Sequence, residues 1–397
     1  MFSLKKKLSP NLRSALERKI FKTYKVIVHC KNLSDKIYKN IVSYKGESIR
    51  YISSINCICA ILHPNHIERL LEYPQVDFIT FDDYALLCGA SVHAANKIHL
   101  QHNLKLKGKG VTLGLIDSGV FPHLDLLNPE NKLLTFVDLL NELKYPYDDF
   151  GHGTFLSGLI AGSGFCSNGM YRGIAEECKL YVVKAFNRCG KGYISDVLFS
   201  LELLINESEE NNIKVICLPF ELINNDYFFI DLFSKLFDLA ISKNIVVVVP
   251  AGNNGPAEDS IRGISTLSNC ISVGGVDTRG NNIKPSSISS SASSNKVKLD
   301  LSAACEDICS LRADTSYISQ RNGIKLYPTA IETPYINFSG TSCAAAYIAA
   351  ICVLYFESNP ALCFKDVKAL LKLSCKLQDF NVSRQGSGIF DINNAFL

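Results

Sequence analysis

The chain has 397 residues and a mass of 43.8 kDa, and 47% of its residues are hydrophobic while 20% are charged. At about 100–200 residues per domain, this length predicts two domains, or one large domain with an appendage. Lysine and arginine (41) barely exceed aspartate and glutamate (38). The net charge of +3 therefore does not indicate binding to nucleic acid or to an anionic membrane.

The first part of the chain predicts a basic lead-in, residues 1–22, that is helical or loose. A small α+β module follows over residues 23–88. Its expected elements, in chain order, are a strand at Tyr24–His29, a polar helix, a strand at Ser54–Leu62, a helix at His66–Leu71 and a strand at Val76–Phe81. Residues 82–108 are polar with glycine and lysine, which is typical of a linker with a short helix.

From Val111 onward, short apolar strands alternate with segments of helix length, and this pattern predicts a doubly wound, mostly parallel α/β domain over residues 89–397. Continuous Val/Ile/Leu strands are typical of a sheet that is covered on both faces. The expected strands are Val111–Ile116, Lys179–Lys184, Ile213–Leu218, Ile245–Pro250 and Cys270–Val273; the expected helices are Thr154–Ala161, Ser195–Ile205, Leu232–Lys243, Ser342–Phe356 and Lys365–Leu373.

Cysteine usage indicates the compartment. There are fifteen cysteines, an odd number, none in a Cys-x-x-Cys pair and most inside apolar runs, where a free thiol behaves as a small hydrophobe. The N-terminal residues lack the continuous apolar stretch of a signal peptide, and no run reaches the ~18 apolar residues of a membrane span. We therefore expect a cytoplasmic protein without a membrane partner.

Four polar side chains stand where a sheet of this kind collects its functional groups, beyond the carboxyl ends of strands or at the start of helices. Asp117 and Asn253 each follow an apolar strand, while His152 and Ser342 follow glycines before a helix. Each alone would be read as a cap, a turn or a loop residue. Together they supply a carboxylate, a base, an amide donor and a nucleophile, which are the groups needed for acyl transfer.

The residues around these four positions resemble the signature blocks of subtilisin-like serine proteases, over about Leu104 to the C-terminus. The blocks are Ile116-Asp117-Ser118-Gly119, His152-Gly153-Thr154, Ala251-Gly252-Asn253 and Gly340-Thr341-Ser342. The resemblance implies an Asp117–His152–Ser342 triad, with Asn253 donating to the oxyanion. It also implies endoproteolytic hydrolysis of peptides or proteins through an acyl-enzyme.

The module at residues 24–85 resembles the small α+β propeptides of this family, which assist folding and inhibit the enzyme. The chain as a whole is most similar to the cytoplasmic AprX-type branch. This resemblance implies a zymogen in which the protein's own propeptide is an intramolecular inhibitor and in which processing falls within Tyr84–Ala90. We expect the protein to be a monomer.

The substrate-binding strand departs from the family pattern. The family generally has Ser-Leu-Gly there, whereas this chain has Leu218, Pro219 and Phe220, followed by Glu221; Ala251-Gly252 are expected on another edge of the pocket. Pro219 removes an N–H from pairing with a peptide. The Glu221 carboxylate favours a basic residue at or near the cleaved position. The alternative is a catalytically silent subtilase-like scaffold that regulates a partner protease. An esterase is a further rival, although it would lack a Gly-x-Ser-x-Gly elbow.

The sequence gives little support for a metal. Asp125 matches an acidic position that can reach calcium in the family, but a cage of 6–8 oxygen ligands cannot be assembled from the sequence. We expect no metal site and no required cofactor; a structural calcium is possible but unsupported. Asp148 and Asp149, just before His152, are interpreted as solvated loop residues or as a long-range field on that histidine, and Cys343 as a packing residue.

Overall fold

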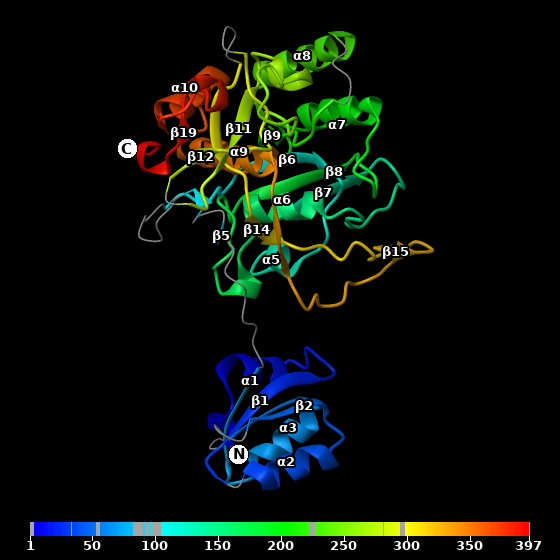
Figure 1. Cartoon of the computed structure of the whole chain (residues 1–397). Helices are drawn as coiled ribbons and strands as arrows, with labels where there is room; N and C mark the ends of the chain where they lie inside the picture. Colours follow the sequence, from blue (N-terminus) through cyan, green and yellow to red (C-terminus); the bar gives the residue numbers. More distant parts are fainter. Residues whose placement is uncertain are drawn as a thin grey trace. The chain divides into compact units, whose positions relative to one another are not determined.

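The computed structural model describes residues 4–32, 34–52, 56–81, 90–91, 95–96, 105–222, 227–280, 282–293 and 298–396. The chain divides into two compact units, Met1–Cys88 and Gly89–Leu397 (Figure 1). The predicted processing segment, Tyr84–Ala90, lies outside the described residues except for Ala90, as does most of the predicted linker.

The first unit is a four-stranded antiparallel sheet in the order β2–β3–β1–β4, covered by helices. Its elements are η1 (Leu4–Lys7), α1 (Pro10–Glu17), β1 (Tyr24–Cys30), α2 (Ser34–Ser43), β2 (Glu47–Ile52), β3 (Cys57–Leu62), α3 (Pro64–Leu71) and β4 (Val76–Phe81). Leu8, Leu12 and Ala15 are buried in the same core cluster as β1. The N-terminal residues are therefore part of this unit, which corrects the interpretation of residues 1–22 as a separate lead-in.

The second unit contains a mostly parallel sheet, and its chain order alternates strands with helices. Its elements are β5 (Ala90–Ser91), β6 (Thr112–Asp117), α5 (Leu124–Leu127), β7 (Leu133–Asp138), α6 (His152–Ala161), η3 (Phe165–Ser167), β8 (Lys179–Lys184), α7 (Ile194–Asn206), β9 (Ile213–Cys217), α8 (Tyr227–Ser242), β10 (Val246–Pro250), η4 (Gly263–Thr266), β11 (Ile271–Asp277), β12 (Lys284–Pro285), β13 (Leu301–Ala304), β14 (Ile308–Leu311), β15 (Gln320–Arg321), β16 (Ile324–Lys325), β17 (Tyr335–Phe338), α9 (Thr341–Ser358), α10 (Phe364–Leu373), β18 (Cys375–Lys376), η5 (Val382–Arg384), β19 (Ile389–Phe390) and η6 (Ile392–Asn394).

The main sheet has the order β18–β19–β13–β11–β10–β9–β6–β8–β7, and every pair from β19 to β7 is parallel. Helices α6, α9 and α10 pack on one face, and α7 and α8 on the other (Figure 1). Successive residues of β10 enter the two cores alternately, Val246 and Val248 on one face and Val247 and Val249 on the other. Because both faces are buried, the strands are apolar throughout. The predicted α/β fold is confirmed.

Helix α9 crosses the interior of this unit, and its residues from Thr341 to Phe356 are all buried. Among the described residues it is long and apolar enough to cross a membrane by length and composition, although 89% of that window is buried inside the protein. This corrects the expectation that no such run exists. The helix is apolar on all sides because it packs against the sheet, α6 and the C-terminal elements.

Candidate active site

Asp117 is the last residue of β6, at the point where the strand order reverses between β8 and β9. Groups beyond the carboxyl ends of parallel strands meet at such a switch point. The side chain is buried, and its Oδ1 accepts the Ser118 N–H at 2.6 Å. The Asp117 carbonyl accepts the N–H groups of Ala185 and Phe186, so the backbone is fixed as well.

His152 is the first residue of α6 and lies between Asp117 and Ser342. It follows Gly151, whose φ of 97° is in the left-handed region that favours glycine. His152 Nδ1 is 2.9 Å from Asp117 Oδ2 and 3.0 Å from Oδ1, while Nε2 is 3.0 Å from Ser342 Oγ. The tautomer that satisfies both contacts carries its proton on Nδ1 and accepts the serine hydroxyl at Nε2.

Ser342 is the second residue of α9, directly after Gly340-Thr341. The backbone N–H groups in the first turn of a helix have no acceptor within the helix, and the helix dipole favours negative charge there. The Ser342 hydroxyl therefore stands beside both a hydrogen-bond acceptor, His152 Nε2, and an electropositive helix end.

The pKa of His152 is set by opposing influences. Burial is the largest single one and would lower the pKa, because it disfavours the charged imidazole. The charge and hydrogen bond of Asp117 and the charge of Asp148 together outweigh burial and raise the pKa of His152 above its ordinary value. The site therefore favours the protonated ring.

Asn253 lies in the loop after β10, and its side-chain carbonyl is held by the start of α9. Thr341 N–H and Thr341 Oγ1 both donate to Asn253 Oδ1 at 3.0 Å. With the oxygen end bound in this way, the Nδ2 end of the amide is left to donate elsewhere. The four predicted residues Asp117, His152, Asn253 and Ser342 therefore lie around one point.

The side chain of Glu221 also binds the loop that carries Asn253. Its Oε1 accepts the Asn253 N–H at 2.5 Å, and its Oε2 accepts Asn254 Nδ2 at 2.6 Å. Both carboxylate oxygens are thus engaged by the protein. Beyond the predicted preference for a basic substrate residue, this carboxylate has a structural role, because it holds the loop.

The predicted substrate-binding residues lie on two neighbouring strand ends. Leu218 is buried, and its N–H donates to the Val248 carbonyl at 3.0 Å; Pro219 is buried beside it. The Phe220 ring packs on Phe186 and Phe233, with centroids 5.2 and 6.4 Å apart. Its side chain is therefore used in packing.

The other expected edge, Ala251-Gly252, follows β10. Ala251 N–H donates to the Val273 carbonyl at 2.7 Å, and the Gly252 carbonyl accepts the Ser290 N–H at 2.9 Å. Gly252 has φ 104°, and a Cβ there would lie 2.6 Å from Glu221 Oε2. Only glycine fits this position.

Two aromatic rings beside His152 escaped the sequence analysis. Phe338, at the end of β17, lies edge-on to the imidazole with centroids 5.7 Å apart, and Phe150 lies at 6.4 Å. Both are partly exposed, so they can exclude water from one side of the histidine. No sequence pattern links Phe338 to His152, because the contact depends on how β17 folds back over α6.

Comparison with known proteins decides the family. A family model described as "Subtilase family" matches residues 108–388. The serine protease AprX of Bacillus subtilis (strain 168) is 33% identical over 359 residues, which cover 86% of this chain and 79% of AprX. The chain belongs to the subtilase family. It is a subtilisin-like serine endopeptidase, as the resemblance of its motifs predicted.

Other subtilases agree. Subtilisin DY of Bacillus licheniformis is 25% identical over 283 residues, covering 70% of this chain and 88% of its own. Among solved structures, the S41 psychrophilic protease has a TM-score of 0.63 at 22% identity and covers 78% of this chain and 100% of its own. That likeness supports the fold.

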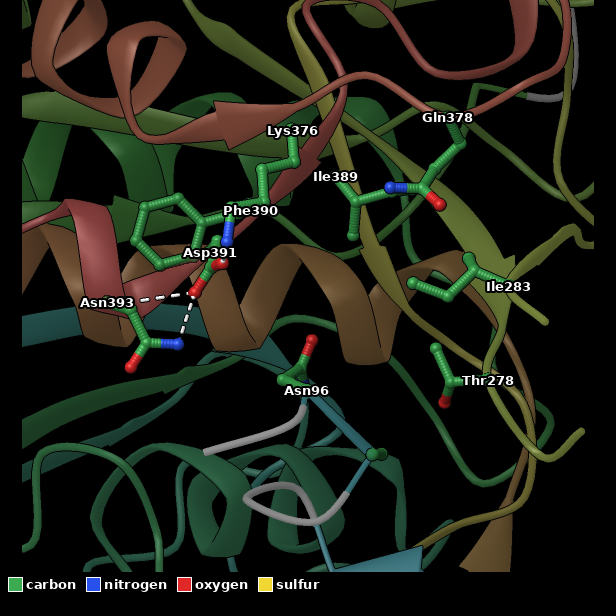
Figure 2. Close-up of a pocket in the computed structure, with 10 residues that line it drawn as sticks. Asn96, Thr278, Ile283, Lys376, Gln378, Ile389, Phe390, Asp391 and Asn393 are labelled. Carbon is green, nitrogen blue, oxygen red and sulfur yellow. Dashed lines mark hydrogen bonds and ion pairs between the residues drawn. The ribbon is translucent and has the colours of Figure 1, made fainter. Parts of the chain in front are cut away.

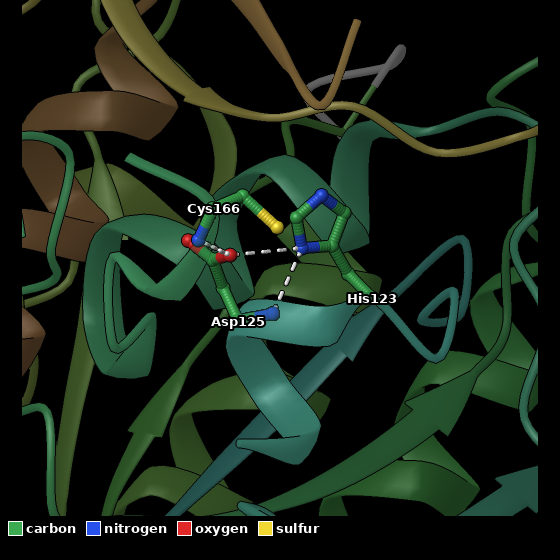
Figure 3. A group of neighbouring side chains, drawn as sticks. All are labelled: His123, Asp125 and Cys166. Carbon is green, nitrogen blue, oxygen red and sulfur yellow. Dashed lines mark hydrogen bonds and ion pairs between the residues drawn. The ribbon is translucent and has the colours of Figure 1, made fainter. Parts of the chain in front are cut away.

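The calcium contact that the family pattern suggested, Asp125, lies in a cluster with His123 and Cys166, and one ligand atom from each lies within 4.8 Å of the others (Figure 3). Asp125 Oδ1 accepts the Cys166 N–H at 3.0 Å, and Oδ2 accepts the Tyr335 hydroxyl at 2.6 Å. His123 Nδ1 accepts the Asp125 N–H, and Nε2 donates to the Pro334 carbonyl, both at 3.1 Å. Calcium takes 6–8 oxygen ligands, so this nitrogen- and sulfur-containing set does not fit it.

The structure also has a pocket of about 310 Å³ that contains none of the predicted site residues. Figure 2 shows it between the turn after β11 and the C-terminal strands. Its lining consists of Ala95, Asn96, Thr278, Ile283, Lys376, Gln378, Ile389, Phe390, Asp391 and Asn393. This pocket is therefore separate from the cluster of Asp117, His152 and Ser342.

Proposed function

We propose that Asp117, His152 and Ser342 form the catalytic triad of this endopeptidase and cleave peptide bonds through an acyl-enzyme. The observation that carries the proposal is the continuous hydrogen-bonded chain from Asp117 Oδ2 to Nδ1 at 2.9 Å and from Nε2 to Ser342 Oγ at 3.0 Å. Ser342 Oγ attacks the scissile carbonyl while His152 Nε2 takes its proton. His152 then gives that proton to the leaving amine, and Asp117 stabilises the imidazolium.

The negative charge on the attacked carbonyl oxygen is stabilised by two donors, Asn253 Nδ2 and the Ser342 N–H. The bonds from Thr341 to Asn253 Oδ1 support this role, since they fix which end of the amide is free. Donors that are already oriented need no reorganisation when the charge develops. No cofactor takes part in these steps.

We further propose that the first unit is a propeptide that inhibits the second until it is cleaved off. The support is that Met1–Cys88 is a separate compact unit with its own core, as a propeptide that folds beside its enzyme requires. Thirteen of the described cysteines, among them the exposed Cys189 and Cys363, form no disulfide, and free thiols favour action in the cytoplasm. The substrates are peptides or proteins, and the enzyme acts as a monomer.

The test is intact mass of purified wild type beside Ser342→Ala, each with and without a fluorophosphonate probe. Wild type should lose its N-terminal unit and gain the probe, whereas Ser342→Ala should do neither. Processing in Ser342→Ala would contradict self-cleavage.

Wild type that stays full-length and unlabelled would favour the alternative function, a silent scaffold that regulates a partner protease. The specific feature that favours this alternative is the strand end at Pro219-Phe220-Glu221. There an N–H is missing, and the ring and carboxylate are engaged by the protein itself.

A further inference from the structure

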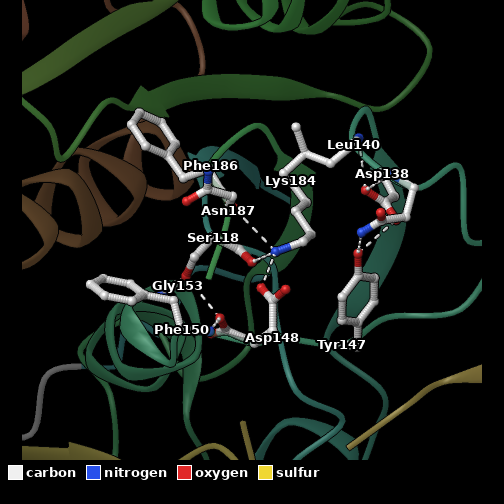
Figure 4. A network of polar contacts seen from close by, with 12 residues as sticks. Ser118, Asp138, Leu140, Tyr147, Asp148, Phe150, Gly153, Lys184, Phe186 and Asn187 are labelled. Atoms are coloured by element: carbon white, nitrogen blue, oxygen red, sulfur yellow. Dashed lines mark hydrogen bonds and ion pairs between the residues drawn. The ribbon is translucent and has the colours of Figure 1, made fainter. Parts of the chain in front are cut away.

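Asp148 is a fully buried carboxylate four residues before His152, in the loop that leads into α6. It was predicted to be a solvated loop residue or a distant charge, and its burial rules out the first. A buried carboxylate is costly unless hydrogen bonds satisfy its oxygens. Figure 4 shows Asp148 in a network of polar contacts together with Ser118, Phe150 and Gly153.

Five hydrogen bonds converge on this carboxylate. Oδ1 accepts the Ser118 hydroxyl at 2.8 Å, the Phe150 N–H at 3.2 Å and the Gly151 N–H at 2.7 Å. Oδ2 accepts the Thr154 N–H at 2.8 Å and the Thr154 hydroxyl at 2.6 Å.

These bonds fix the first turn of α6 on both sides of the histidine. Gly151 precedes His152 and Thr154 follows it by two, and both backbone N–H groups point to the same carboxylate. Helix N-termini leave such N–H groups without intrahelical acceptors, and a carboxylate is a favoured partner for them. The backbone that carries His152 is therefore clamped by one side chain.

The same carboxylate is linked to the triad aspartate through one serine. The Ser118 hydroxyl donates to Asp148 and accepts the Gly153 N–H at 3.0 Å, while the Ser118 N–H donates to Asp117 Oδ1 at 2.6 Å. Ser118 thus connects the end of β6 to the start of α6. This connection joins the two elements that carry Asp117 and His152.

The charges that act on the histidine are Asp117 on β6 and Asp148 on the preceding loop. Next to Asp148 in the sequence, Asp149 forms an ion pair with Lys184 at the end of β8. The buried Lys184 Nζ lies 2.5 Å from Asp149 Oδ1, 2.5 Å from the Ser118 carbonyl and 3.1 Å from the Phe186 carbonyl. Asp149 is thereby paired with a cation. Within the described part of the chain, no ion pair joins Asp148 to one, so its negative charge acts on His152.

We infer that Asp148 is a positioning residue for the proposed triad. Through Ser118 and the first turn of α6, it holds His152 where Nδ1 meets Asp117 and Nε2 meets Ser342, and its charge favours the imidazolium that forms when Ser342 attacks. The inference rests on the proposed triad. It goes beyond that proposal because Asp148 touches neither substrate nor the reacting atoms.

The test is the second-order rate of Ser342 labelling by a fluorophosphonate, measured against pH, because this reaction does not depend on the unknown substrate. Asp148→Asn removes the charge and replaces one acceptor oxygen by a donor. We expect the maximal rate to fall roughly 10- to 100-fold, since small misplacements of a catalytic group have effects of this size. The acid limb of the profile of labelling rate against pH should move to lower pH, because a negative charge that favours protonated His152 has been removed.

The matched control is Asp138→Asn. Asp138 is also buried and also closes a loop: its oxygens accept the N–H groups of Leu140, Asn141 and Leu143 and the Tyr147 hydroxyl. The Asp138→Asn variant should unfold at a lower temperature than wild type. The acid limb of its profile of labelling rate against pH should match that of wild type. A folded Asp148→Asn protein with the rate and acid limb of this control would overturn the inference.

A milder variant covers the case in which Asp148→Asn does not fold. Ser118→Ala removes the hydroxyl that links Asp148 to the Gly153 N–H and keeps both carboxylates. It should slow labelling several-fold and leave the acid limb in place; an unchanged rate would count against the linkage. Wild type that is not labelled at all would overturn the triad itself, and the positioning role with it.

Discussion

The carboxylate of Glu221 accepts the backbone N–H of Asn253 at 2.5 Å, although the two residues lie 32 positions apart in the sequence. An acidic residue next to the strand end that is predicted to bind substrate thus holds the loop that carries the proposed oxyanion donor. Its second oxygen binds Asn254 Nδ2 at 2.6 Å, so the loop is gripped at two successive residues.

Glu221→Ala should therefore lower kcat more than it changes KM, by roughly tenfold, because the Asn253 amide loses its support. Glu221→Gln keeps an acceptor oxygen and should lie between wild type and the alanine variant. Steady-state kinetics on a fluorogenic peptide measure both constants. Equal kcat in all three proteins would show that Thr341 alone positions Asn253.

Removal of the donor itself should cost more. Asn253→Ala is expected to lower kcat by roughly 10²–10³ with little change in KM, a magnitude taken from the corresponding donor of subtilisin. Asn254→Ala is the matched control, since it removes a neighbouring amide that binds Glu221 rather than the oxyanion. The proposed role is wrong if the two variants lose activity equally.

The pH dependence follows from His152. Although burial alone would lower its pKa, Asp117 and Asp148 raise it above the ordinary histidine value of about 6.5. The ring must be neutral to accept the Ser342 proton, so activity is lost as pH falls through this raised pKa. The acid limb of kcat/KM should therefore have its midpoint above the ordinary value. A midpoint at or below it would contradict the balance of charges described above.

The cluster of His123, Asp125 and Cys166 should behave as a metal-free structural element, because its donor atoms bind one another and the backbone. Millimolar EDTA or calcium should leave the thermal unfolding temperature unchanged. His123→Ala should lower the free energy of unfolding by about 1–3 kcal/mol, since it leaves buried partners unsatisfied. A fall in unfolding temperature on chelation would show that a cation contributes.

Much of the fold could be predicted from the sequence because both faces of the main sheet are buried. The strands that lead to Asp117 and Asn253 are mostly apolar runs for that reason, and such runs can be recognised in the sequence. Strand β13, Leu-Ser-Ala-Ala, was missed because its small residues have little β preference, and its pairing with β11 is non-local. The N-terminal helix α1 was detectable in part, since its buried residues Leu12 and Ala15 lie three positions apart, on one helical face.

The site was only partly predictable. The signature blocks name four residues, but Asp148 and Glu221 look like ordinary loop carboxylates in the sequence. Their structural roles come from the N–H groups that donate to them. Which N–H groups these are depends on which loops lie next to each other in the fold. Residue patterns along the sequence do not show these contacts between distant loops.

Helix α9 carries Ser342 at its first turn, passes through the middle of the unit and comes late in the chain. During synthesis, Asp117, His152 and Asn253 leave the ribosome well before Ser342, the proposed nucleophile. Parallel strand β19, which pairs with β13, follows later still. The proposed triad is therefore incomplete while the growing chain is unfolded and its loops are open to cleavage. It is completed only when the domain closes around α9.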